Sequence, residues 1–136
     1  MLATFDAAAR ETCVVRQSRT NTPLQSLNLL NDVTFVEAAR ALGARMLRDS
    51  SENTASRIAH GFQLATARHP TPDELRVLTA GFERRLAQYK ADPAAAAKLL
   101  TIGESPLDKS LDVVPWAAYT TVGNVLLNLD EFVTRE

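Results

Sequence analysis

The sequence predicts an all-α fold, a compact bundle of about five or six helices with an extended N-terminal arm. Three observations predict it: apolar residues recur at helical spacing in successive segments, capping residues precede those segments, and the connections are short. Short connections make consecutive helices neighbours, so the segments are expected to pack together. We divide the chain into an arm at residues 1–17 and a helical domain at residues 18–136.

The arm contains apolar residues without a sustained period, among them Phe5, Val14 and Val15. Its TCVVR stretch could pair as a strand, but no second strand-like segment offers a partner, and an isolated strand is not stable. We therefore expect residues 1–17 to be the least ordered part of the isolated chain, and part of the fold to lie upstream of Met1.

The first helix is expected to begin at Pro23, because proline suits the first helical turn. Leu24, Leu27 and Leu30 then recur at helical spacing and predict a short buried stripe. Asp32 follows and can cap the next helix, so this stretch is interpreted as a helical corner.

The next two helices are separated by the polar turn SSENTAS. The first of them, within VTFVEAARALGARMLRDS, is the clearest amphipathic helix, and its expected solvent-facing side includes Glu37, Arg40 and Ala44. The second runs through Ile58 and Phe62 and ends near residues 68–70, and Gly61 inside it would permit close approach of a neighbouring helix.

The fourth predicted helix has the strongest start signal in the chain. In TPDE at 71–74, a threonine cap and a proline precede Glu74, which stands at the capping-box position. Asp92 and the proline after it form a second cap-plus-proline start, for a helix through AAAAKLLTI. Gly103 is placed to end that helix in a left-handed cap. Beyond a loop at 103–112, Asp112 can cap a last helix whose apolar stripe continues to Val133.

Composition excludes several classes of function. The net charge is −1 and the bases form no stripe, so a nucleic-acid partner is not expected. The single Cys13, together with His60 and His69 nine residues apart, gives no metal-ligand spacing. Ser105 has no histidine near it in sequence to activate it, and no other catalytic residue is identified. No segment approaches the ~20 apolar residues of a membrane span, and we expect no cofactor in this chain.

Two groups of polar residues are candidates for a site. Arg19, Asn21 and Gln25 crowd the entrance to the first helix, where they could bind an anion or tie the loop to backbone carbonyls. A second group lies within apolar runs, where an unpaired polar group costs about 1–3 kcal/mol. We expect it to form a structural polar cluster as the helices at 23–30 and 113–130 pack together at the centre; its members are Asn28, Asp32, Asn124, Asn128 and Asp130.

Three stretches carry a family resemblance: MLATFDAAARETCVVRQSRTNTPLQSLNLLNDVTFVEAAR, RHPTPDEL, and LLTIGESPLD followed by NVLLNLDEFVTRE. They resemble the C-terminal part of the planctomycete-specific domain of unknown function that is found with planctomycete-type cytochrome c domains. The resemblance implies a bacterial protein that is secreted or in the cell envelope, with haem in an associated domain. It also implies that the present chain continues from a missing upstream region.

Two hypotheses for function remain. In the first, the chain is a non-catalytic helical module that packs against an upstream domain of the same polypeptide, in a protein whose partners include an envelope redox protein. In the second, it is part of a ligand-binding or enzymatic site whose catalytic groups lie upstream, with Arg19, Asn21 and Gln25 as a polar wall. The arrangement of these side chains discriminates between the two, since donors saturated by local carbonyls favour the module.

Overall fold

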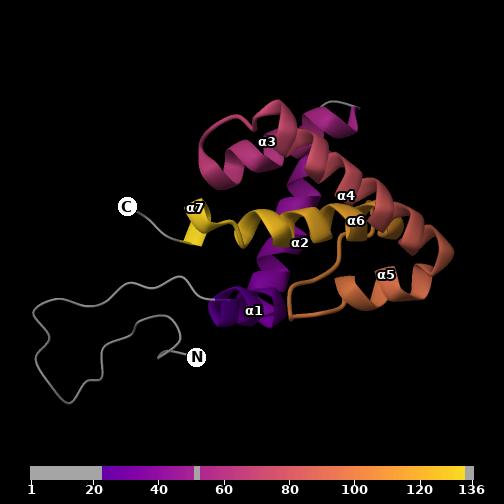
Figure 1. The fold of residues 1–136 in the computed structure, drawn as a ribbon. Coiled ribbons are helices and arrows are strands. Elements are labelled where there is room, and N and C mark those ends of the chain that lie inside the picture. Colours follow the sequence, from indigo (N-terminus) through magenta and orange to yellow (C-terminus); the bar gives the residue numbers. More distant parts are fainter. Residues whose placement is uncertain (1–22, 51–52, 134–136) are drawn as a thin grey trace, which may run out of the picture.

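A computed structural model of the chain describes residues 23–50 and 53–133, and within them every regular element is a helix (Figure 1). The helices are α1 (Pro23–Asn31), α2 (Val33–Asp49), α3 (Thr54–Thr66), α4 (Pro72–Ala91), α5 (Pro93–Leu100), α6 (Val113–Leu127) and α7 (Asp130–Val133). The predicted all-α bundle is confirmed, with α7 a single turn of four residues. The arm predicted at residues 1–17 lies outside the described residues.

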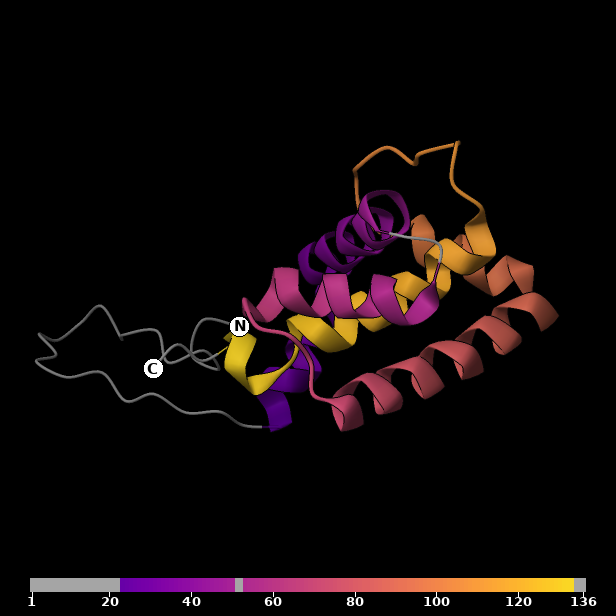
Figure 2. The same ribbon diagram turned by 90° about the horizontal axis from the view of Figure 1, so that it is seen from above.

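Helix α6 is the central element of the bundle. It packs along α2 and also contacts α3, α4, α5 and α7 (Figures 1 and 2). Tyr119 in its middle is buried and stacks on Phe82 of α4 with ring centroids 4.4 Å apart. The apolar stripe predicted for this helix is buried at Trp116, Tyr119, Val122 and Leu126, and neighbours on several sides also bury Ala117, Ala118 and Thr120.

Two glycines let α2 and α6 cross in backbone contact. A Cβ added to Gly43 of α2 would lie 2.9 Å from the backbone nitrogen of Thr120. A Cβ added to Gly123 of α6 would lie 2.7 Å from the carbonyl oxygen of Ala39. Since both distances are shorter than carbon can tolerate, the crossing requires glycine at both positions.

The predicted capping residues act as expected. The Asp32 carboxylate accepts from the backbone N–H of Thr34, and Asp112 accepts in the same way at the start of α6. At α4, Thr71 and Glu74 form a complete capping box. These signals depend only on residues within one helical turn, so they could be identified without knowledge of the tertiary structure.

Three other predictions about helix ends and faces were wrong. Helix α5 ends at Leu100 with Thr101 as its cap, so Gly103, at φ 95°, belongs to the following loop. The last helix stops at Leu127 and does not continue to Val133: the Asn128 N–H bonds the Val125 carbonyl three residues back, and the separate turn α7 follows. Helix α2, and not α1, is the main partner of α6, so the expected central pairing of α1 with α6 does not occur.

The stripe predicted to be buried on α1 is exposed to solvent. Leu24 is 55% exposed, Leu27 56% and Leu30 39%, and Val33 at the start of α2 is 53% exposed. Within the described part of the chain, α1 packs mainly on α2, so this face has no covering layer. We call these four residues the α1 leucine row.

Candidate functional site

The candidate ligand-binding residues at the entrance to α1 are mostly beyond the described structure. Arg19 and Asn21 lie outside the described residues, and Gln25 lies in the first turn of α1. Their proposed polar pocket therefore stays a prediction.

The residues of the predicted structural polar cluster occupy several different positions. Asp32 caps α2, and the amide nitrogen of Asn124 donates to the Leu30 carbonyl of α1 over 3.5 Å. The side-chain oxygen of Asn128 is buried with no hydrogen-bond partner among the described residues. Asn28 lies within α1, and Asp130 begins α7. Whether they act as one cluster stays a prediction.

A buried arginine that the sequence placed on the solvent side organises one end of the bundle. Arg40 is only 4% exposed, and its guanidinium reaches the loop after α5. It donates to the carbonyls of Leu100, Ile102 and Ser105, the last over 2.9 Å, and it pairs with Glu37 over 3.4 Å. This set of contacts saturates the guanidinium with backbone carbonyls, which assigns Arg40 a structural role.

Glu37 completes this network from the same face of α2. Its Oε1 accepts from the backbone N–H groups of Glu104 and Ser105 at 2.9 and 2.7 Å. Hydrogen bonds from Ser105, first from its side chain and then from its backbone, hold the pKa of Glu37 below its ordinary value. The positive φ of Gly103 lets the loop backbone lie against the Glu37 side chain. Figure 2 shows the connection from α5 to α6 beside α2.

The burial of Arg40 could not be predicted from the helical pattern, because the loop that covers it is about sixty residues away in sequence. Arginine at a polar position of an amphipathic helix ordinarily faces solvent, so the expectation that Arg40 is exposed was wrong. Ala44, also expected on the outer side, is buried against residues of α5 and α6. The alanine on that side of α2 was the one sign in the sequence that the side could be buried, since alanine is often found in protein interiors.

A second arginine joins three elements at the opposite side of the bundle. Arg68, in the connection after α3, bonds both Glu74 at the start of α4 and Glu131 of α7 at 2.7 to 3.0 Å, and its guanidinium lies 4.7 Å from the Phe62 ring centroid. The hydrogen bond from Arg68, followed by that from the Thr71 backbone, lowers the pKa of Glu74 to about 2. The bonds to Glu74 and then Glu131 raise the pKa of Arg68.

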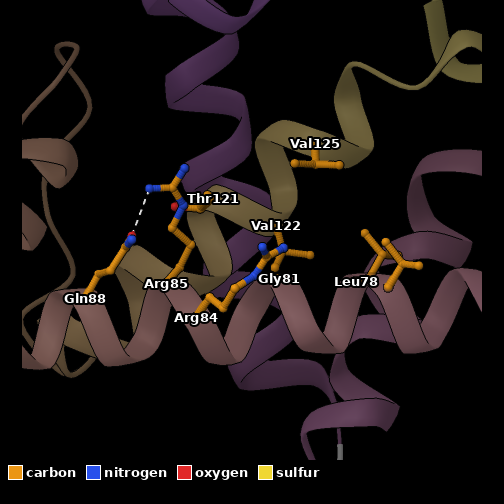
Figure 3. A pocket seen from close by; sticks show the side chains of 9 residues that line it. Leu78, Gly81, Arg84, Arg85, Gln88, Thr121, Val122 and Val125 are labelled. Carbon is orange, nitrogen blue, oxygen red and sulfur yellow. Dashed lines mark hydrogen bonds between the residues drawn. The ribbon is translucent and has the colours of Figure 1, made fainter.

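A groove of about 370 Å³ lies between α4 and α6, and we call it the α4–α6 groove (Figure 3). Apolar side chains line one part of it: Leu78 and Val77 from α4, with Val122 and Val125 from α6. The polar part consists of Arg84, Arg85, Gln88 and Thr121. Gly81 lies between these parts on α4, and a Cβ there would meet nothing within 4 Å.

The groove was not identified from the sequence, because it depends on how α4 lies against α6. Arg84 and Gln88 were placed on the outer face of the fourth helix, and Gly81 gave no signal of its own. Within residues 23–50 and 53–133, no group of three or more acidic, histidine or cysteine side chains is placed to hold a metal ion. No described helix combines the length and apolar character that a membrane crossing requires.

Comparison with known proteins gives one match. The family model PSD1, described as a protein of unknown function (DUF1553), matches residues 1–82, which include α1, α2 and α3 and the first half of α4. Neither the comparison with curated proteins nor that with solved structures found a match.

Proposed function

We propose, from the premise that this chain belongs to the DUF1553 family of proteins of unknown function, that it is a non-catalytic helical packing and interaction module. Its surface for packing is the α1 leucine row. In this proposal the module docks through that row onto an upstream domain of the same polypeptide.

The observation that carries the proposal is the exposure of four large aliphatic side chains along one short segment. Leu24, Leu27 and Val33 each expose more than half of their surface, and Leu30 adjoins them. Contiguous exposed apolar patches of this kind mark sites of protein interaction. Full burial of such a side chain contributes about 1.5–3 kcal/mol, so covering the exposed half of each against a partner would contribute about half of that.

The polar chemistry of the described residues supports the same choice between the two hypotheses. Arg40 and Glu37 form hydrogen bonds with the backbone of one loop, and Arg68 forms ion pairs with two carboxylates. Charged groups whose hydrogen bonds are made within the chain in this way position the helices and the loop.

The wider setting of the module is also a proposal. We infer that the parent is a secreted or envelope protein of a planctomycete that carries cytochrome c domains, with haem bound there and an envelope redox protein among its partners. The support is the resemblance of the SRTNTPLQ and NVLLNLDE blocks to the planctomycete-specific domain.

The docking surface can be tested with separately produced parts of the full-length protein. The upstream region is mixed with the 136-residue chain, and sedimentation velocity measures whether the two associate. Leu24→Ser with Leu27→Ser should abolish the association, whereas Leu107→Ser, at an exposed leucine in the loop before α6, should leave it intact. Association that survives the double substitution, or none with the unaltered chain, would contradict the proposal.

A further inference from the structure

The α4–α6 groove is separate from the α1 leucine row and has an apolar end and a cationic end. Figure 3 shows Leu78 toward one end of the groove, with Arg85 and Gln88 at the other. The apolar part remains open to solvent, because Val77 is 59% exposed and Val125 is 44% exposed. Water in contact with these side chains would be released when an aliphatic group covered them.

Gly81 keeps the groove open at its middle. It stands between the apolar and cationic ends on α4, and a side chain there would point into free space. The resulting volume of about 370 Å³ falls in the range of cavities that hold small ligands.

Among the described residues, the two arginines of the groove have no carboxylate partner, unlike several other arginines of the chain. Arg40, Arg45, Arg48, Arg68 and Arg76 each pair with an acidic side chain. By contrast, Arg85 donates to the neutral amide oxygen of Gln88 over 3.0 Å, and among the described residues neither Arg84 nor Arg85 has an acid within ion-pair distance. Two guanidinium groups that line one groove without an acid beside them favour an anionic ligand, and carboxylate matches the planar geometry of guanidinium.

We propose that the α4–α6 groove binds an aliphatic carboxylate, the free acid of a medium-length hydrocarbon chain. The hydrocarbon covers Val77, Val122 and Val125, and the carboxylate accepts from Arg84 and Arg85. A cation with the same hydrocarbon chain is repelled by the arginines, and a short carboxylate lacks the apolar body that fills the groove. Both parts of the ligand are therefore required.

The test titrates the isotopically labelled 136-residue chain with sodium decanoate below its micelle-forming concentration and follows the amide signals of Gly81 and Thr121 by NMR. Decanoate should bind at these signals at least tenfold more tightly than acetate or decyltrimethylammonium. Equal binding of the two decyl compounds would overturn the proposal, as would the absence of decanoate binding. An amphipathic leucine–glutamate peptide that binds where decanoate does not would also overturn it and assign the groove to a protein partner.

Three variants locate the ligand in the groove. Arg84→Gln with Arg85→Gln should lower decanoate affinity at least tenfold, and Gly81→Leu should do the same by filling the cavity. Lys90→Gln removes an exposed positive charge from the same helix outside the groove and should leave the affinity within twofold. Circular dichroism confirms that each variant is folded. Unchanged affinity in the double arginine variant or in Gly81→Leu, or an equal loss in Lys90→Gln, would overturn the assignment.

Discussion

The same substitution, glycine to alanine, should have opposite effects on stability at two positions of the bundle. At Gly123, the added methyl carbon would lie 2.7 Å from the Ala39 carbonyl oxygen, where ordinary contact begins at about 3.4 Å. Because both groups are held by helix backbones, α2 and α6 would have to separate by about 0.7 Å, a gap that forfeits a substantial part of their dispersion contacts. At Gly81, the methyl would meet nothing within 4 Å.

These geometries give the magnitudes. Overpacking costs up to about 3 kcal/mol. The higher helix propensity of alanine stabilises the helix by about 1 kcal/mol when it replaces glycine. Gly123→Ala should therefore lower the free energy of unfolding by about 2 kcal/mol, which corresponds to a melting temperature lower by about 6–10 °C for a domain of this size. Gly81→Ala should raise the free energy of unfolding by up to about 1 kcal/mol.

Urea unfolding followed by circular dichroism measures both effects, and Gly43→Ala, at the same crossing, should behave like Gly123→Ala. A stabilising Gly123→Ala would refute the close crossing of α2 and α6. A destabilising Gly81→Ala would show that the groove is not open as described.

Other predictions concern the two arginine networks. Arg40→Met should lower the free energy of unfolding by about 3 kcal/mol, because it removes the ion pair with Glu37 and the donor to three loop carbonyls. The exposed Arg45→Met should cost under about 1 kcal/mol. Equal losses of the two variants in urea unfolding would contradict this. The folded-state pKa of Glu74 is lowered to about 2, so its contribution to stability is present above its ordinary value of 4.5 and is lost as the pH falls toward 2. Glu74→Gln should therefore flatten the decrease in stability across this range, and an unchanged pH profile would count against the Arg68 network. Glu37, whose pKa is also lowered, contributes in the same direction, so Glu37→Gln should destabilise the chain less at acidic pH than near neutrality, as thermal unfolding at several pH values can measure.

The features that the sequence predicted correctly are local ones. The caps at Asp32 and Asp112 and the capping box at Thr71 depend on side chains within one turn of the backbone they bond. The helical spacing of Leu75, Leu78, Phe82, Leu86 and Tyr89 in the sequence predicts one apolar side for the fourth helix, and these residues do pack in the core.

The features that the sequence did not predict depend on distant contacts. Arg40 is buried by a loop that folds back over α2. The residue pattern of α2 alone does not indicate that contact. Leu24 and Leu27 were expected to be buried because an apolar stripe needs cover, but the pattern does not say which part of a protein supplies it. The α4–α6 groove arises from the packing of two helices and from a missing side chain at Gly81.

The most direct test of the proposed docking surface is hydrogen exchange at the backbone amides of α1, measured in the 136-residue chain and in the full-length protein. If an upstream domain covers the α1 leucine row, the amides of residues 24–31 that exchange rapidly in the isolated chain should become protected at least tenfold in the full-length protein. The amides of α4, which does not pack on α1, should be unchanged. Equal exchange of α1 in both proteins would contradict the account.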